Sequence, residues 1–481
     1  MSTKVAVRGN FIGGEWLEDV GEGSLEVLNP STGEVIAEVP NASAETVDRT
    51  VKAAERAFAK YSDTTPAERA GYLLKLGDAV EDHAEELGRL ESENVGKPVA
   101  GAIEEMGFIA DCFRFFAGAA RNIEGKASGE YIAGRTSMIR REPIGVCAGI
   151  APWNYPLMMA VWKIGPALAS GNVSIIKPSE LTPLTTLKLA ELAADILPPG
   201  VFNVITGDGL PTGDALVRHP RVRFISITGD VSTGKLIARN ATDNLKRVHL
   251  ELGGKAPAIV FDDADMERVA KTLRLASFYN SGQDCTAACR VLVQGKVYDK
   301  FLSDFVPQIE SLNVGDPGKS QDVEMGPVIS AEQKERVLGF VERAEAAGGR
   351  VASGGESVTA NGFFVQPTVV TDVNQEAEII QKEVFGPVVT VQRFTDEEQA
   401  IEWANGVEYG LAASVWSKDA GRLMRVARKI QFGCVWLNDH VTLVNEMPHG
   451  GFKQSGYGKD MSMYSLEDYT VVKHVMLNIE P

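Results

Sequence analysis

Cys285 is the residue whose sequence context best suits covalent chemistry. It follows Gly282, Gln283 and Asp284, in a polar stretch directly after an apolar helical pattern. Gly282 permits a tight turn and a close approach of the backbone to a ligand. A nucleophilic cysteine needs a polar setting that favours its thiolate, and we expect this loop to supply one. Most free cysteines are simply buried apolar residues, so the neighbours of Cys285 carry the prediction.

The other cysteines form no pattern of their own. The chain has 5 Cys, a sparse set without paired CxxC spacing, which predicts neither a disulfide framework nor a metal site. Cys289, four residues after Cys285, could act as a resolving thiol. An inert neighbour of the nucleophile is the simpler interpretation.

Glu251 lies in a second run with the features of a site, HLELGGK at residues 249–255. On a strand, His249 and Glu251 point to one face and the two leucines to the other. The Gly-Gly pair ends the strand and lets another segment approach. The residues alone leave open whether Glu251 is a functional carboxylate or a solvated one.

Asn154 lies in a third run, APWNYP at residues 151–156, directly after a strand-like stretch. Ligands of parallel sheets bind at the carboxyl ends of the strands. The Asn154 amide is an uncharged donor, which suits the stabilisation of an oxyanion. The alternative is a proline-bounded turn that Asn154 caps.

Two further runs follow strand-like stretches and suit a nucleotide. Lys177, Pro178, Ser179 and Glu180 combine an ammonium with a carboxylate that could bind ribose hydroxyls, although a solvated pair is equally possible. Residues 228–234, TGDVSTG, form a Gly-rich turn into a helix, where phosphates are often held. This run lacks the GxGxxG pattern and is weak evidence alone.

Alternating strand-like and helical stretches position these runs. From Ile144 to Thr242 the alternation predicts a parallel sheet with crossover helices. A second α/β region follows, in which Asp265 caps a helix that ends near residue 280, before Cys285. The expected strands are Ile144–Ile150, Asn172–Ile176, Phe202–Ile205, Val222–Ile227, Ala258–Phe261, Val388–Val391 and Cys434–Leu437, and the expected helices are 45–60, 67–90, 157–169, 184–197 and 212–217.

Length and charge bound the class of protein. A chain of 481 residues is too long for one core, so we expect two or three domains. Its formal net charge of −17 disfavours nucleic acid and anionic membranes as partners. No apolar run has the length of a membrane span, and Met1–Asn10 lacks the apolar stretch of a signal peptide, so a cytoplasmic location is expected.

Together these runs resemble the aldehyde dehydrogenase superfamily. Three further runs look most like its bacterial γ-aminobutyraldehyde dehydrogenases: FRFFAGAAR at residues 113–121, FYNSGQDCTAACR at 278–290 and EMPHGG at 446–451. The resemblance extends from NPSTGE at residues 29–34 to SGYGK at 455–459. The most specific runs are LELGGK at 250–255 and GQDC at 282–285, with KEVFGP at 382–387 as a third.

The resemblance implies an α/β fold with a Rossmann-like cofactor domain (1–124 and 142–250) and an α/β catalytic domain (251–440). A small β oligomerisation flap (125–141 and 458–481) is implied as well, in a homotetramer or homodimer. Cys285 is the implied nucleophile and Glu251 the general base, and Asn154 joins the Cys285 backbone N–H at the oxyanion. NAD is the implied cofactor, no metal is implied, and the implied NAD-binding residues are Ala151, Pro152, Trp153, Lys177, Pro178, Ser179, Glu180, Gly229, Asp230, Val231, Ser232, Thr233, Glu383 and Phe385.

Three positions depart from the pattern of the family. Asp230 stands where many relatives have Ser or Gly, which would put a carboxylate beside a pyrophosphate. Val231 replaces a common Thr. Asp460 stands where some relatives carry a Glu proposed as a proton relay, so that role is in doubt.

The same resemblance implies a substrate with an amino group. Tyr155, Trp162 and Tyr279 match residues that line the aldehyde tunnel of aminoaldehyde and betaine aldehyde dehydrogenases, and aromatic faces attract ammonium groups. Glu105 could pair with the amine, although it could equally be a surface residue. The implied reaction oxidises 4-aminobutanal, in equilibrium with 1-pyrroline, to 4-aminobutanoate, with betaine aldehyde as the alternative. From other classes, a cysteine hydrolase using His249 and a non-catalytic protein on this fold remain as alternatives.

Overall fold

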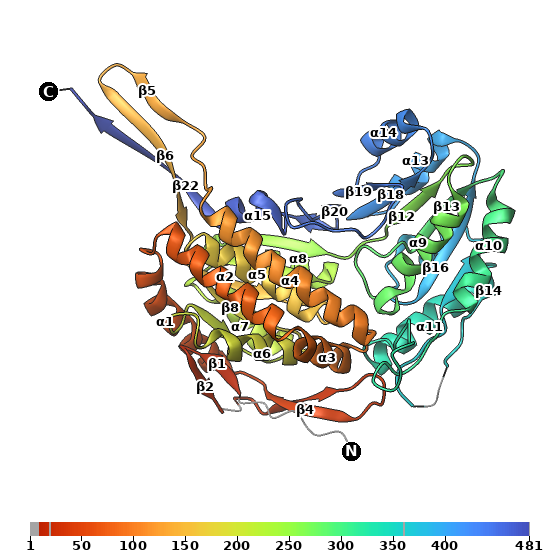
Figure 1. Cartoon of the computed structure of the whole chain (residues 1–481), viewed down its shortest axis with the longest axis horizontal. Helices are drawn as coiled ribbons and strands as arrows, with labels where there is room; N and C mark the ends of the chain where they lie inside the picture. The colour runs from red at the N-terminus through yellow and green to blue at the C-terminus, as the bar shows by residue number, and fades with distance from the viewer. Residues whose placement is uncertain (1–8, 19–20, 359–360, 481) are drawn as a thin grey trace.

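Two large β-sheets and one small projecting sheet dominate the fold (Figure 1). The computed structural model describes residues 9–18, 21–358 and 361–480. The expected absence of a signal peptide concerns a segment, Met1–Asn10, of which residues 1–8 lie outside these ranges. Within the described ranges, no helix is both long and apolar enough to cross a bilayer.

The first sheet contains the parallel strands expected between residues 144 and 227. Its strand order is β2-β1-β9-β8-β7-β10-β11-β21, and the run from β9 to β11 is parallel throughout. Helices α1 and α5 both contact β8, which explains why that strand is buried along its whole length. The strands are β1 Asn10–Ile12, β2 Glu15–Leu17, β7 Val146–Ile150, β8 Val173–Lys177, β9 Phe202–Val204, β10 Val222–Gly229, β11 Arg247–Leu252 and β21 Gly456–Tyr457.

Two of the helices around this sheet, α1 and α2, begin at side chains that satisfy free backbone N–H groups. Ser43 caps α1, and Thr65 forms a capping box with Glu68 at the start of α2. The prediction of a single helix over residues 67–90 was wrong, because the backbone leaves helical geometry at His83 and two helices form. The helices are α1 Ala44–Tyr61, α2 Pro66–Asp82, α3 Ala84–Val95, α4 Val99–Ala120, α5 Pro156–Ala169, α6 Leu184–Ala193, α7 Asp214–Arg218 and α8 Val231–Ala241; the hairpin β3 Ser24–Leu28 and β4 Val35–Pro40 precedes them.

The second sheet has the order β14-β15-β16-β13-β12-β18-β19 and is parallel except for the β14–β15 pair. The predicted cap is confirmed: Asp265 accepts a hydrogen bond from the Arg268 N–H at the start of α9. The strands are β12 Pro257–Val260, β13 Arg290–Gln294, β14 Arg350–Ser353, β15 Thr368–Thr371, β16 Val388–Phe394, β18 Ala412–Trp416 and β19 Cys434–Leu437, and the helices are α9 Met266–Phe278, α10 Tyr298–Glu310, α11 Ala331–Ala346, α12 Glu378–Gln381, α13 Glu397–Asn405 and α14 Ala420–Lys429.

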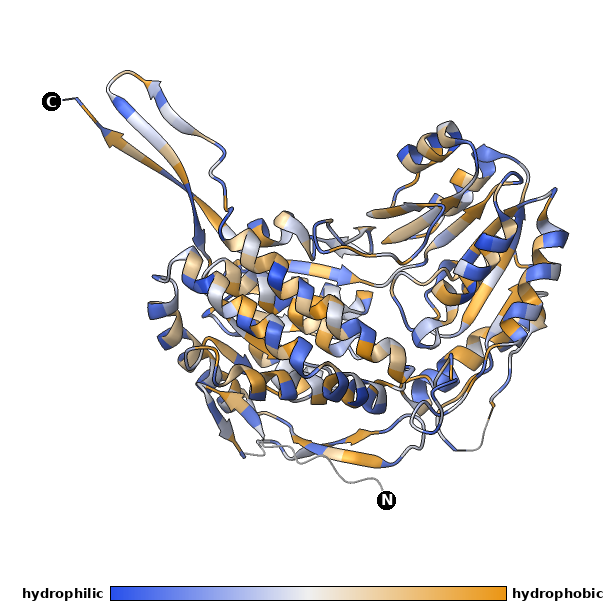
Figure 2. Cartoon of the chain, in the orientation of Figure 1, coloured by the Kyte–Doolittle hydropathy of each residue, from blue (hydrophilic) through white to orange (hydrophobic). Residues whose placement is uncertain are grey.

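The third sheet joins β5 (Ser128–Ile132), β6 (Arg135–Pro143) and β22 (Thr470–Asn478), which extend away from the body (Figure 1). Strand β22 is largely apolar in Figure 2, yet Val472 is 63% exposed and Leu477 is 59% exposed. The segment 458–481 is not all strand, because 462–468 form helix α15 (Ser462–Asp468) before β22. The expected α/β fold is confirmed, whereas the domain boundaries stay predictions.

Candidate active site

The loop that carries Cys285 has an unusual backbone conformation. After α9, Asn280 and Ser281 adopt positive φ angles of 50° and 57°, and Gly282 follows with φ 67°. A Cβ atom at Gly282 would lie 2.2 Å from the Gly386 carbonyl oxygen, so only glycine fits there. Positive φ at two non-glycine residues costs energy that surrounding contacts must offset. Cys285 therefore lies in a loop after α9, as predicted, and the turn at residues 280–282 leads into that loop.

Asn154 is one of the residues that hold this loop. Its side-chain N–H donates to the Gln283 carbonyl at 3.0 Å, and its own carbonyl accepts from the Asn280 amide at 3.0 Å. Asn154 is buried, at the end of β7 as expected. The Asn154 amide therefore lies beside the nucleophile loop, and its second N–H remains available to a ligand.

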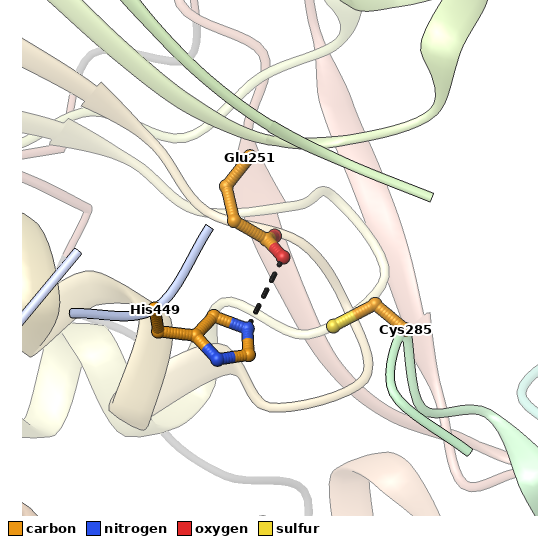
Figure 3. A group of neighbouring side chains, drawn as sticks. All are labelled: Glu251, Cys285 and His449. Atoms are coloured by element: carbon orange, nitrogen blue, oxygen red, sulfur yellow. Dashed lines mark ion pairs between the residues drawn. The ribbon is translucent and has the colours of Figure 1, made fainter. Parts of the chain in front are cut away.

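Glu251 and Cys285 meet a third group, His449, that had been given no role (Figure 3). The donor atoms of the three side chains all lie within 4.8 Å of one another. The His449 Nε2 is 3.5 Å from Glu251 Oε1. His449 belongs to the run EMPHGG, which had contributed only to the resemblance. Its spacing from Cys285 in the chain offers no signal, because packing alone brings them together.

The other histidine considered for this site lies elsewhere. His249 is on the same face of β11 as Glu251, as alternation predicts, but its Nδ1 lies 3.2 Å from the Ser226 hydroxyl and 3.7 Å from Asp460. Asp460 is fully buried and also lies 3.8 Å from the Lys163 Nζ. The imidazole beside the nucleophile is therefore that of His449, not that of His249.

The expectation that this setting favours the thiolate was wrong. Burial and the carboxylates of Glu251, Asp284 and Glu383 raise the pKa of the Cys285 thiol well above its usual value. A polar loop sequence does not reveal that its neighbours are mostly anionic. The thiol is therefore protonated at rest, and a base must remove its proton before it can attack. The sulfur of the second cysteine of this loop, Cys289, lies 3.9 Å from the Ala256 carbonyl oxygen.

A cavity of about 280 Å³ connects the catalytic cluster to many of the residues proposed for the cofactor. It lies at the carboxyl ends of β7, β10 and β11, where parallel sheets bind ligands. Sequence reasoning missed the contribution of α11, because nothing in its pattern marks a ligand site. The lining comprises Pro152, Trp153, Asn154, Thr228, Gly229, Asp230, Glu251, Leu252, Gly253, Cys285, Glu332, Gln333, Arg336, Glu383 and Phe385.

Helix α11 holds the segment that contains Glu383 and Phe385. Gln333 donates to the Phe385 carbonyl at 2.5 Å, and Arg336 donates to the Glu383 carbonyl at 2.8 Å. The Glu383 carboxylate accepts from the Gly254 N–H at 2.7 Å. Burial raises the pKa of Glu383 to about 7, although that hydrogen bond acts in the opposite direction. The Phe385 ring lies edge-on to Trp153, with ring centroids 5.2 Å apart.

Asp230 has a structural reason to be where relatives carry Ser or Gly. Its carboxylate caps α8 by accepting from the Ser232 N–H at 2.7 Å. Burial would raise the pKa of Asp230, but hydrogen bonds from Ser232 and Thr233 lower it overall. An ionised carboxylate therefore occupies the helix N-terminus at which a pyrophosphate is expected, while Val231, Ser232 and Thr233 form the first turn.

Lys177 lies at the end of β8, as predicted, and is buried. Its Nζ donates to the carbonyls of Gly207 at 2.6 Å and Pro178 at 3.0 Å, and lies 3.7 Å from Glu180. Ser179 between them is also buried, and its hydroxyl accepts from the Leu181 N–H. The Lys177 ammonium is therefore held by backbone carbonyls, whereas the Glu180 side chain is 39% exposed.

Three of the four residues proposed for the substrate are aromatic. Tyr155 donates to Asp284 at 2.7 Å, directly before Cys285, and Tyr279 donates to Glu105 at 2.6 Å. Trp162 lies inside α5, with its ring centroid 5.3 Å from that of His449. The three aromatic residues therefore lie around the nucleophile loop.

Glu105 is not a surface residue, and it already has a cationic partner. Its carboxylate lies 2.5 Å from the Nζ of Lys97, which also contacts Glu91 at 3.2 Å. The Lys97 ammonium lies 4.4 Å from the centroid of the Tyr155 ring. The chain thus supplies its own ammonium here, so an incoming amine would reach Glu105 only by competing with Lys97.

Comparisons with known proteins identify the family of the chain. The pattern of the aldehyde dehydrogenase family matches residues 16–475. The chain is 42% identical to a betaine aldehyde dehydrogenase of Bacillus subtilis over 98% of this chain and 97% of the relative. It is 38% identical to a chloroplastic aminoaldehyde dehydrogenase of Arabidopsis thaliana, over 99% and 97% of the two chains.

A crystal structure of betaine aldehyde dehydrogenase from Staphylococcus aureus in complex with NAD+ has a TM-score of 0.97 to this fold. The two sequences are 39% identical, and the match covers 99% of this chain and 96% of the other. Such identity over nearly the whole of each chain excludes a shared fold alone as the explanation. The chain belongs to the aldehyde dehydrogenase family.

Proposed function

We propose that this enzyme uses NAD to oxidise an aldehyde with a cationic amino group, and that Cys285 forms the covalent thioester. The observation that carries the proposal is that Cys285, Glu251 and Asn154 line the same cavity. The expected first substrate was 4-aminobutanal, and the names of the relatives favour its alternative, betaine aldehyde. Both belong to the proposed class.

The residues along the cavity fit a dinucleotide. Trp153 and Phe385 offer aromatic surface beside the catalytic cluster, and Glu383 offers a carboxylate for ribose hydroxyls. Outside the residues that line the cavity, Lys177 and Glu180 at the end of β8 offer an ammonium and a carboxylate for a second ribose. NAD bound there would accept the hydride that leaves the aldehyde carbon.

The first chemical role belongs to Glu251. Because the Cys285 thiol is protonated at rest, we assign Glu251 to remove that proton. The thiolate attacks the aldehyde carbon, the C–S bond forms, and the carbonyl oxygen becomes an oxyanion. The Asn154 amide and the Cys285 N–H stabilise this oxyanion, an effect worth roughly 3–4 kcal/mol per donor.

The second role of Glu251 follows oxidation, when the acyl group is a thioester on Cys285. Once Glu251 has passed the thiol proton to solvent, its carboxylate removes a proton from water, the hydroxide attacks the thioester carbon, and the C–S bond breaks. The Cys285 thiolate is released together with the carboxylic acid product. General-base catalysis of this kind typically contributes about 10²–10⁴-fold to the rate.

The proposed preference for a cationic substrate rests on two tyrosine rings whose hydroxyl groups are hydrogen-bonded to carboxylates. Tyr155 and Tyr279 each donate their hydroxyl to a carboxylate, that of Asp284 and Glu105 respectively. Such hydrogen bonds make the ring faces more negative, and a cation over a ring gains roughly 0.5–2 kcal/mol. One face of Tyr155 is already occupied by Lys97, so a substrate cation would have to approach the opposite face.

A three-substrate comparison tests the proposal. We expect kcat/KM for betaine aldehyde and for 4-aminobutanal to exceed that for uncharged butanal, and the better cation identifies the main substrate. Butanal performing as well as either cation would remove the case for an amine site. The measurement is NADH absorbance with each aldehyde at a fixed pH.

Choice of dinucleotide, assembly and location are proposed on separate grounds. A carboxylate at Glu180 would repel a 2′-phosphate, so NAD should be preferred to NADP. Equal catalytic efficiency with both would contradict this. The exposed apolar residues of β22 support pairing between subunits in a homodimer or homotetramer. A cytoplasmic location stays a prediction.

A further inference from the structure

The side chains of Glu251, Cys285 and His449 make up a set of metal-binding donors as well as a catalytic cluster. A thiolate, an imidazole nitrogen and a carboxylate oxygen are the three donor types that zinc uses in proteins. They come from three distant parts of the chain, β11, the loop after α9, and residues 446–451, and converge in Figure 3. The sulfur of Cys285 points toward the other two.

The polar atoms of this cluster are short of partners. Among the residues that the structure describes, both carboxylate oxygens of Glu251 are buried without a hydrogen bond, and the Nε2 of His449 faces them. Both side chains are at most 2% exposed. A buried polar atom without a hydrogen-bond partner raises the free energy of the folded protein. Binding of a ligand that satisfies such atoms is favoured, because it removes that cost. These atoms point to a ligand, independently of the donor types.

The spacing of the donors suits a small cation after a modest adjustment. Donor atoms on a tetrahedral zinc ion lie about 3.5 Å apart, given bonds of about 2.0–2.3 Å. Here all three lie within 4.8 Å of one another. Side-chain rotations that move the donor atoms by about 1 Å would therefore bring them to the spacing found around zinc. Three protein ligands leave the fourth position open, as in many zinc sites that react with small molecules.

We propose that Glu251, Cys285 and His449 form an inhibitory site for a thiophilic divalent cation, with Zn²⁺ as the main ligand. When Zn²⁺ binds, the Cys285 S–H bond breaks, a Zn–S bond forms, and the proton passes to solvent. No oxidation state changes. The two formal negative charges of thiolate and carboxylate then offset the charge of the ion, which leaves the buried cluster neutral.

The consequence for the enzyme is that one ion would block two catalytic groups together. Cys285 could not attack an aldehyde, and Glu251 could not accept a proton. The inhibition should be reversed by a chelator, because no covalent bond to carbon is made. Mg²⁺ and Ca²⁺ should not inhibit, since both prefer oxygen ligands to a thiolate and an imidazole.

Cadmium reports this site directly, since a cadmium–thiolate bond has an ultraviolet charge-transfer band. When the full-length enzyme is titrated with Cd²⁺, without aldehyde or NAD, this band should grow until one Cd²⁺ is bound per subunit. Zn²⁺ should suppress the band by competing for the site. Cys285→Ala should abolish the band, whereas the matched control Cys289→Ala should retain it. His449→Phe, which keeps an aromatic ring against Trp162, should weaken Cd²⁺ binding about tenfold or more.

A second measurement needs no variant. Zn²⁺ should protect Cys285 of the wild-type enzyme from iodoacetamide, as read by peptide mass spectrometry, and EDTA should restore alkylation. Retention of the band in Cys285→Ala, its loss in Cys289→Ala, unchanged affinity in His449→Phe or unimpeded alkylation would each overturn the metal site. None of these readouts involves aldehyde oxidation, so failure here is distinguishable from failure of the proposed function.

Discussion

Lys97 is the buried charge whose removal should be most costly to the fold beside the active site. Its ammonium is fully buried and lies between the carboxylates of Glu91 and Glu105. Burial lowers the pKa of Lys97, but the two carboxylates outweigh that effect and raise it, so the ammonium is charged. Lys97→Met keeps most of the side-chain volume and leaves two carboxylates without their cation.

The expected magnitude follows from this geometry. Removing one partner of a buried ion pair costs about 3–5 kcal/mol, because the remaining charge is uncompensated. For 481 residues the entropy of unfolding is about 1 kcal/mol/K, so the melting temperature should fall by about 3–5 °C. Adding Glu105→Gln removes one of the stranded charges, so the double variant should recover part of that loss.

Differential scanning calorimetry at one fixed scan rate is the appropriate assay, because a chain of this size can unfold irreversibly. Glu105→Gln alone is the matched control, since it leaves Lys97 paired with Glu91. The reasoning would be refuted by a Lys97→Met shift below about 1 °C, or by a double variant no more stable than Lys97→Met.

Three further predictions concern the cavity. Asn154→Ala should lower kcat by about 10²–10³-fold, because one oxyanion donor is lost; a loss below about tenfold would exclude that role. Asp230→Asn keeps a cap on α8 but removes its charge, so KM for NAD should fall by about two- to fivefold in steady-state assays, and an increase would contradict the placement of the pyrophosphate. Glu383 has a pKa of about 7, above its ordinary value of 4.5, so its contribution to stability is present below about pH 4.5 and is lost as the pH rises through 7. Wild-type melting temperature should therefore fall relative to that of Glu383→Gln over this range, and parallel pH profiles would show that Glu383 does not titrate there.

Much of the scaffold could be predicted, because its signals are local. Seven strands were expected from apolar runs and all seven formed, and the cap at Asp265 formed as its position before an apolar helical pattern indicated. The break at His83 was missed, since no proline or glycine marks it and tertiary packing decides where the helix ends.

The site was harder to predict, because its electrostatics depend on residues far apart in the chain. The sequence identified Cys285 and Glu251 by their neighbours, but it could not show that His449 packs beside them. Nor could it show that Lys97 occupies the partner position at Glu105. The first pairing depends on how distant segments pack together, the second depends on the turn between α3 and α4, and no apolar pattern records either.

The most direct test of the central claim is the intact mass of Glu251→Gln after it is mixed with NAD and 4-aminobutanal or betaine aldehyde. Loss of Glu251 should slow thiol deprotonation but slow thioester hydrolysis more, so this variant should still release a slow burst of NADH and accumulate a subunit heavier by one acyl group. Cys285→Ala should show neither signal. An active Cys285→Ala enzyme, or an acyl group on any residue other than Cys285, would contradict the account.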